Sequence, residues 1–196
     1  MPNWCFNLGT ISGKKADVRY FIKAALINDT DVDVENMTAD DFIAHIIGEK
    51  FTFSKWLPMP KTYKDFDTTN YPEKYPDKVK EQQETCGAVG WYEWQVANYG
   101  CKWDCEFDNF SYCENGNDAT IEFSLETPWS PPVNFFSNIQ HKFPKLHFEL
   151  EFIEPGMGFA GHGETMVEFD DIVTFITVEY NDIYESPLYE YDEEIE

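Results

Sequence analysis

The spacing of apolar residues along the chain predicts an α+β fold built on an antiparallel sheet. Residues 4–11 alternate as in a half-buried strand, and the apolar residues of 14–27 recur at the spacing of an amphipathic helix. The Asn-Gly pair at 115–116 separates two strand-like segments, 103–113 and 119–126, and so predicts a hairpin. A further helix and strand follow. This order is that of a ferredoxin-like sheet, the split βαβ arrangement.

The first strand and the first helix have the most regular patterns. Trp4, Phe6 and Leu8 share one face of the strand, while Cys5 and Asn7 take the other. The helix carries a continuous apolar stripe on one side. This stripe consists of Val18, Phe21, Ile22, Ala25 and Leu26.

Residues 28–100 are predicted to form a mainly helical insertion that begins with an acidic loop. Thr38 to Asp41 resembles a capping box with Asp in place of Glu, so it predicts the start of a helix. The inward-facing residues of that helix are predicted to be Phe42, Ile43, Ile46 and Ile47. Residues 51–56 are compatible with a strand, and residues 77–86 and 91–98 are predicted to be helices.

The last third of the chain completes the sheet and adds strands to it. Ser130-Pro131-Pro132 predicts a helix start with Ser130 as the N-cap, and the helix ends near Pro144. Residues 146–152 alternate as in a half-buried strand, and one or two more strands are expected, around 158–168 and 172–180. We therefore expect a single domain over residues 1–180, with its insertion at about 28–100, and an acidic tail over 181–196.

The net charge of the chain disfavours nucleic acids as partners. The chain has 196 residues, and its 37 acidic and 14 basic residues give a net charge of −23. Nucleic-acid binding depends on Lys and Arg displacing counterions from phosphates, so direct binding to DNA or RNA is disfavoured. Lys145 is the last basic residue, and fifteen acidic residues follow it.

Nothing in the chain indicates a membrane or secreted protein. No stretch approaches the roughly 18 apolar residues of a membrane span, and the N-terminus lacks the pattern of a signal peptide. An odd number of cysteines favours reduced thiols; these are Cys5, Cys86, Cys101, Cys105 and Cys113. We expect a cytoplasmic protein in the host cell cytosol, with no cofactor and an undefined oligomeric state.

Four short motifs are spread over most of the chain. They are Met1-Pro2-Asn3-Trp4-Cys5, Asn98-Tyr99-Gly100-Cys101-Lys102-Trp103-Asp104, Pro128-Trp129-Ser130-Pro131-Pro132 and Glu154-Pro155-Gly156-Met157-Gly158-Phe159-Ala160-Gly161. In this order they resemble the YubB-type ferredoxin-like domain family of plasmid, phage and pathogenicity-island proteins. The resemblance implies a ferredoxin-like fold and a mobile-element origin. It implies no catalytic residue and no cofactor.

Two chemical sites are considered and disfavoured. Cys101, Cys105 and Cys113 with His162 offer zinc ligands, but their spacings are wider than the tight pairs of structural zinc sites, so buried thiols are favoured. No local signature marks a Cys-His nucleophile pair, and a mobile Gly161-His162-Gly163 loop explains that motif as well as a site does. The residues favour a binding protein over an enzyme.

Two further ligand sites are weighed. The glycine-rich segment 159–163 is followed by Glu164 and Glu168 and by no basic residue, so a phosphate site there is rejected. The motifs around Trp103 and Trp129 carry aromatic residues that suit a ligand pocket. Core packing and helix capping explain them more simply.

The acidic segments are the predicted partner-binding site. In the tail, carboxylates alternate with tyrosines, a composition that suits docking on a basic, partly apolar groove as well as it suits a solvated tail. The predicted partner-binding residues are Asp29, Asp31, Asp33, Glu35, Asp182, Glu185, Tyr189, Glu190, Tyr191, Asp192, Glu193 and Glu194.

The leading functional hypothesis follows from charge and resemblance together. It is an acidic phage or mobile-element protein that inhibits a host nucleic-acid-binding or defence protein, such as a CRISPR or restriction nuclease, by DNA mimicry. The partner is then a host protein with a basic surface. One alternative is a small-molecule-binding protein or enzyme with a pocket between sheet and insertion. Another is an accessory protein whose acidity serves only solubility.

Overall fold

A computed structural model describes residues 2–26, 33–34, 36–65, 72–167 and 173–189. Its sheet has six strands in the order β2-β3-β1-β4-β5-β6, and every neighbouring pair is antiparallel. The first four positions are the ferredoxin-like order, and β5 and β6 are the predicted additional C-terminal strands. The strands are β1 (Trp4–Lys14), β2 (Asp108–Asn115), β3 (Asp118–Pro128), β4 (His147–Glu154), β5 (Phe159–Val167) and β6 (Val173–Glu179).

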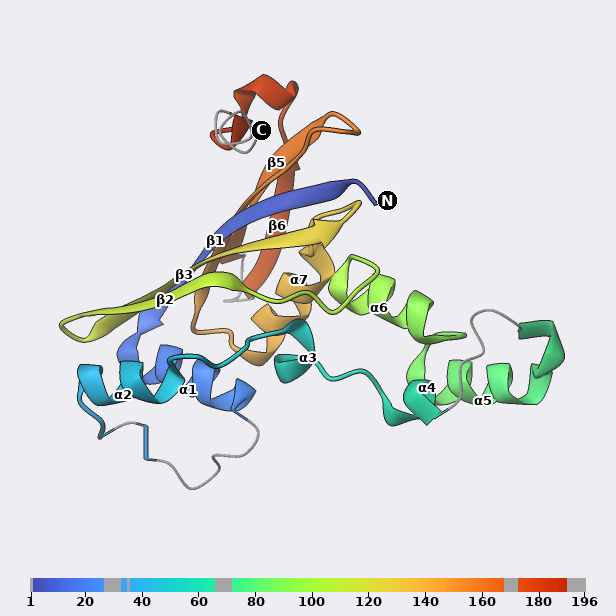
Figure 1. Ribbon diagram of the computed structural model, residues 1–196, viewed down its shortest axis with the longest axis horizontal. Coiled ribbons are helices and arrows are strands. Elements are labelled where there is room, and N and C mark those ends of the chain that lie inside the picture. Colours follow the sequence, from blue (N-terminus) through green and yellow to red (C-terminus); the bar gives the residue numbers. More distant parts are fainter. Residues whose placement is uncertain (1, 27–32, 35, 66–71, 168–172, 190–196) are drawn as a thin grey trace.

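Helices cover one face of this sheet (Figure 1). In α1, the predicted stripe from Val18 to Ala25 is buried, and in α7, Phe136 stacks on Phe175 of β6. The other helices lie between α1 and β2, within the predicted insertion. The helices are α1 (Lys15–Ala25), α2 (Ala39–Ile46), α3 (Phe53–Trp56), α4 (Lys61–Asp65), α5 (Pro76–Cys86), α6 (Trp91–Tyr99) and α7 (Val133–Lys142), with 3-10 turns η1 (Pro72–Lys74) and η3 (Ile183–Glu185).

The two faces of β1 differ in burial. Cys5, Asn7 and Ile11 are fully buried on the helical side. Phe6 and Leu8 point to the opposite side and are only half-buried, and Trp4 is exposed. The predicted division of the strand into two faces is confirmed, and the face that carries Trp4 is opposite to the one that α1 and α7 cover.

The insertion differs from the prediction at residues 51–56. Phe53 to Trp56 form the short helix α3, and Thr52 makes only an isolated bridge to Glu106. Both aromatic rings of α3 are buried, because Phe53 packs on Phe135 and Trp56 stacks on Phe21. A short apolar run is compatible with either a strand or a helix, and tertiary packing decided for the helix. Beyond α3, α4 and α5 project away from the sheet (Figure 1).

Two predicted helix details are settled by the side chains. The Thr38 cap is confirmed, since its hydroxyl oxygen accepts from the backbone N–H of Asp41 at 3.2 Å. The Ser130 cap is wrong. The hydroxyl of Ser130 instead donates to the carbonyl of Gly100 at 2.7 Å, and α7 starts after Pro132.

The inward face of α2 is narrower than predicted. Phe42 and Ile46 are buried, whereas Ile43 is exposed and Ile47 is 76% exposed. The helix ends at Ile46, and Ile47 already has extended backbone angles, so its side chain no longer follows the helical stripe.

A matched pair of variants tests this difference. Ile46→Ala is expected to lower the free energy of unfolding by about 2–4 kcal/mol, because it removes buried methylene groups and leaves a cavity. Ile47→Ala deletes the same atoms from an exposed site and is expected to change it by less than about 0.5 kcal/mol. Urea denaturation measures both. Equal losses of stability in the two variants would contradict the structure, in which Ile46 is buried and Ile47 is exposed.

Candidate functional site

The sheet face turned away from α1 and α7, which we call the open face, carries an array of glutamates. In β1, Thr10 pairs with Glu122 on one side and Glu149 on the other, and Glu149 pairs with Glu164. These residues therefore form one row across four strands. The neighbouring rows add Glu151, opposite Leu8, and Glu126, opposite Phe6.

This array has little compensating positive charge. Among the strand residues, all of which the structure describes, Lys14 is the one Lys or Arg, and it pairs with Asp118 at 2.7 Å. Like charges placed opposite each other on neighbouring strands destabilise a sheet. Within the array, Glu149 has an ion-pair partner in His147, whose Nε2 lies 3.1 Å from its carboxylate. The open face is therefore an acidic surface with little compensating positive charge, which a cationic partner would add.

A hollow of about 370 Å³ lies within the open face, between the row of Thr10 and that of Leu8. Thr10 donates its hydroxyl hydrogen to Glu149 at 2.9 Å, and Tyr180 donates to Glu151 at 2.9 Å. The ring of His162 lies 5.6 Å from that of Tyr180. The carboxylates of Glu149 and Glu151 are held in place by these contacts, so the centre of the array is pre-ordered.

Burial raises the pKa of Glu151, and the charge of Glu149 adds to this effect. The hydrogen bond from Tyr180 and the nearby His162 oppose the rise without cancelling it. The fold therefore favours the neutral carboxyl, and stability is lost as the pH rises through this raised pKa.

Glu151→Gln is expected to stabilise the protein at pH 7, by about 1–2 °C in Tm, because it removes a charge that the fold holds at a cost. Glutamine still accepts the hydrogen bond from Tyr180. The advantage should vanish below about pH 4, where the wild-type carboxyl is also neutral. Thermal melts across this pH range measure the difference, and a lower Tm for the variant at pH 7 would contradict the assignment.

His162 lies inside strand β5, which confirms the strand expected around 158–168 and rules out the mobile loop considered for Gly161-His162-Gly163. The two glycines are required by packing on the helical side. A Cβ at Gly161 would lie 2.6 Å from the Phe152 ring, and one at Gly163 would lie 2.5 Å from the Phe175 ring. The alternation of the strand then directs His162 to the open face.

The segment after β6 packs against one end of the open face. Leu188 is buried with Ile153 and Ala160, and Phe6 and Leu8 pack against them. Tyr180, at the end of the predicted domain, and the tail residues Ile183 and Tyr189 join the same cluster. This part of the predicted tail is therefore a packed edge of the acidic surface.

The predicted partner-binding residues divide between two places. Asp182 caps the η3 turn, Glu185 is exposed within it, and Tyr189 packs on Tyr184 beside the open face. Asp33 lies in the loop before α2, on the helical side, where Asn36 donates to it at 2.7 Å. The remaining predicted residues lie outside the described residues; these are Asp29, Asp31, Glu35, Glu190, Tyr191, Asp192, Glu193 and Glu194.

Sequence reasoning missed the glutamates of the strands as site residues. Their signal was present, because Glu149 and Glu151 occupy the polar positions of an alternating strand and Glu122 and Glu126 do so in the hairpin. Their union on one face depends on the strand order and register, which the sequence pattern does not contain.

The cysteines and histidines do not form a reactive cluster in the described parts of the chain. Cys101 and Cys105 are buried, and both donate to the carbonyl of Trp103, at 3.4 and 3.5 Å. Cys113 lies on the edge strand β2, while His162 lies four strands away on β5. Burial raises the pKa of the Cys5 thiol to about 12. The pKa of the Cys105 thiol is also raised, first by its hydrogen bond with Cys101 and then by burial. Within the described ranges, no group of three His, Cys, Asp or Glu residues is placed to hold a metal ion.

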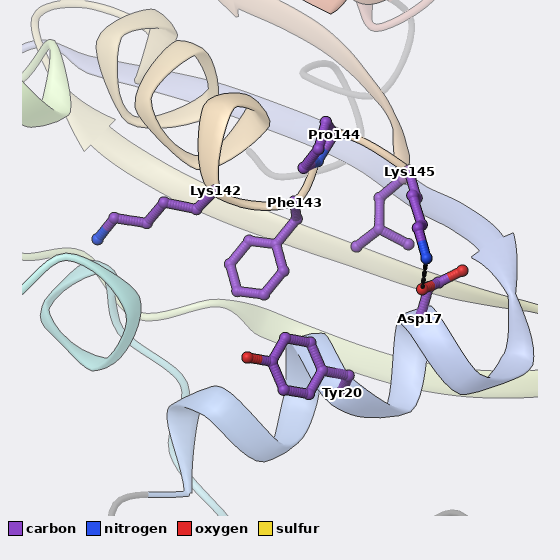
Figure 2. A pocket seen from close by; sticks show the side chains of 7 residues that line it. Asp17, Tyr20, Lys142, Phe143, Pro144 and Lys145 are labelled. Carbon is purple, nitrogen blue, oxygen red and sulfur yellow. Dashed lines mark ion pairs between the residues drawn. The ribbon is translucent and has the colours of Figure 1, made fainter.

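A second hollow, of about 180 Å³, lies between α1 and the turn from α7 to β4 (Figure 2). Tyr20 and Phe143 flank it, and Lys145 pairs with Asp17 at 3.5 Å. The side chain of Lys142 points away and donates to a backbone carbonyl of α3 at 3.0 Å. This hollow is smaller than the roughly 300 Å³ at which ligand pockets begin. A third hollow, of about 320 Å³, does lie between the insertion and the sheet, where residues 43–51 face residues 110–112 of β2.

The fold and its open face define an acidic α+β protein built on a ferredoxin-like sheet. Residues 99–194 match the model of a family described as the ferredoxin-like domain in Api92-like protein. The chain is also similar to a crystal structure of protein api92 from Yersinia pseudotuberculosis, with 13% sequence identity, a TM-score of 0.44 and coverage of 92% of this chain and 99% of that chain. A comparison with curated proteins gave no match. No helix in the described part of the chain has the length and apolar character needed to cross a membrane.

Proposed function

We propose that this protein is a binding protein of a phage or other mobile element that inhibits a host nucleic-acid-binding or defence protein. Its open face covers the basic surface with which that host protein holds nucleic acid. A nuclease of the CRISPR or restriction type is the kind of target that fits this role. The observation that carries the proposal is the glutamate array, since it gathers several carboxylates and little compensating positive charge on one face of the sheet.

The spacing of the array supports mimicry of a nucleic-acid backbone. Residues two apart on a strand are separated by roughly 6.6–6.8 Å, and neighbouring strands by about 4.8 Å. Each strand of duplex DNA carries one charge per about 3.4 Å of axis. Glu149, Glu151 and Glu164 lie on adjacent strands or two residues apart, so their spacing is of the same order as that of phosphate groups, and Glu122 lies one strand further away, across β1. The sheet already fixes the backbone positions of these glutamates, so binding does not have to order their backbone, and the entropic cost of binding is smaller.

A competition experiment tests this function. Proteins retained by the tagged protein from host lysate at low and moderate salt are identified, and the retained protein is assayed for nucleic-acid binding. Retention should weaken with salt, because the contact is between exposed charges. Saturating amounts of the protein should lower the partner's apparent affinity for nucleic acid by about tenfold or more. A partner that binds nucleic acid equally well at saturation would refute inhibition by occupation of its basic surface.

A further inference from the structure

The four sequence motifs converge at one end of the sheet. The backbone N–H of Trp129 donates to the carbonyl of Asn3 at 2.9 Å, which joins the first motif to the third. The hydrogen bond from Ser130 to Gly100 joins the third to the second. The first motif also meets the fourth, because the side chain of Asn3 lies beside Gly156. A Cβ added at Gly156 would come within 2.7 Å of the Nδ2 atom of Asn3.

This convergence exposes three tryptophans, which we call the tryptophan corner: Trp4, Trp103 and Trp129. They are 44%, 36% and 39% exposed. The ring of Trp103 lies 5.8 Å from that of Trp4 and 6.1 Å from that of Trp129. Core packing, which the sequence favoured for these motifs, therefore does not explain Trp103 or Trp129. Grouped exposed aromatic rings are typical of interaction hot spots.

The corner already holds a cation from its own chain. The ammonium of Lys102 lies 5.4 Å from the ring centres of both Trp103 and Trp129, and 5.9 Å from that of Tyr92. These distances are within the range of cation–π attraction. The rings are therefore arranged around a position that favours positive charge.

The backbone at Trp129 is strained to hold its ring there. Its φ angle is +65°, in the left-handed region that residues other than Gly, Asn and Asp seldom adopt. Thr127 supports this turn by donating its hydroxyl hydrogen to the carbonyl of Ser130 at 2.7 Å. Strain maintained at an exposed tryptophan is typical of a functional position.

The corner is continuous with the open face. Trp4 follows the same alternation in β1 as Phe6, and Phe6 pairs with Glu126. A partner lying on the glutamate array therefore reaches the tryptophans next. We propose that the tryptophan corner binds an arginine side chain of the basic partner, and that Lys102 occupies this position in the free protein. The inference rests on the proposed function, because it assumes a basic protein as the occupant.

Arginine fits this position better than lysine does. A guanidinium group is planar and weakly hydrated, so it stacks on an indole ring, whereas an ammonium group is compact and strongly hydrated. The net charge of −23 also favours a cationic ligand over an anionic one. An incoming guanidinium displaces Lys102, whose flexible stem lets its ammonium move into water.

The test compares octa-arginine and octa-lysine peptides, with affinities measured by calorimetry. The wild-type protein should bind the arginine peptide about tenfold more tightly than the lysine peptide. Trp129→Asn, which tolerates the left-handed backbone, should reduce this preference to about twofold or less, and Trp4→Leu should act in the same direction. Lys102→Met should strengthen arginine binding by about threefold, because it removes the competing cation. Circular dichroism checks that each variant is folded.

Two results would overturn the arginine site while leaving the acidic face intact. One is equal binding of the two peptides by the wild-type protein. The other is weaker arginine binding by Lys102→Met, which would show that Lys102 holds the rings in place and does not compete with arginine for them. An open-face variant, Glu122→Gln with Glu149→Gln and Glu164→Gln, should weaken both peptides alike. If neither peptide binds the wild-type protein, the proposed function fails together with this inference.

Discussion

Replacement of Arg19 by alanine is expected to lower the free energy of unfolding by about 3–5 kcal/mol, because it leaves several buried groups without a partner. Arg19 is the only arginine in the chain and is 1% exposed. Its guanidinium donates to the carboxylate of Glu114 and to the carbonyls of Val34 and Met37, the latter two at 2.6 and 2.8 Å. It also lies 4.8 Å above the ring of Phe42. One side chain thus ties α1, the hairpin and the start of α2 together.

Urea denaturation followed by tryptophan fluorescence measures this loss. Arg19→Lys should recover only part of it, since an ammonium group cannot reach all of these acceptors at once. A loss below about 1 kcal/mol for the alanine variant would show that the network contributes little.

The ion pair between Arg19 and Glu114 predicts that the protein loses stability at acidic pH. Burial alone would raise the pKa of Glu114, but hydrogen bonds from Tyr112 and Arg19 and the charges of Arg19 and Lys15 lower it overall. Its contribution is therefore present above the ordinary carboxyl pKa and is lost as the pH falls through the lowered pKa. This loss should be smaller in Arg19→Ala, in which the hydrogen bond from Tyr112 and the charge of Lys15 remain, and urea denaturation at several acidic pH values measures the difference.

Phe135→Ala is expected to lower the free energy of unfolding by about 3–5 kcal/mol. Phe135 of α7 is fully buried, and its ring centre lies 4.4 Å from that of Phe53 and 6.3 Å from that of Trp56, both in α3. It also contacts Tyr99 at the end of α6 and the adjacent Phe136. The insertion and the sheet therefore share one aromatic core around this ring.

The control for this prediction is Phe135→Leu, which keeps an apolar side chain and should cost about 1–2 kcal/mol. Both variants are measured by denaturation. Because the insertion shares its core with the sheet, the transition of the alanine variant should remain a single step. Separate transitions would indicate that the insertion unfolds as an independent unit.

Most of the fold could be predicted because its elements have strong local signals. The stripe of α1 and the alternation of β4 each fix one buried face. The failures occurred where local sequence is compatible with two structures. Phe53 and Trp56 lie in a short apolar run that tertiary contacts made helical, and Ile47 lies one residue beyond the end of its helix.

The site was less accessible to prediction, for a physical reason. Stretches rich in acidic residues predicted a binding site in the loop before α2 and in the tail. The acidic face is instead built from glutamates that are separated by other residues and lie on three strands, β3, β4 and β5. Glu122 and Glu149 are 27 positions apart in the sequence, yet both pair with Thr10. The motifs of Trp4 and Trp129 are also visible in the sequence. The sequence does not show that both rings lie beside Trp103 in the fold.

The central claim, that the open face binds a basic partner, is tested most directly by two variants of equal net charge. The open-face variant and a control, Glu49→Gln with Glu73→Gln and Glu93→Gln, each change −23 to −20 by removing three carboxylates. The residues of the control are exposed and lie outside the sheet. Affinity for the partner retained from lysate is measured at low salt. We predict a loss of about 10- to 100-fold for the open-face variant and about twofold or less for the control. Equal losses in the two variants would contradict the account, because total charge alone would then explain binding.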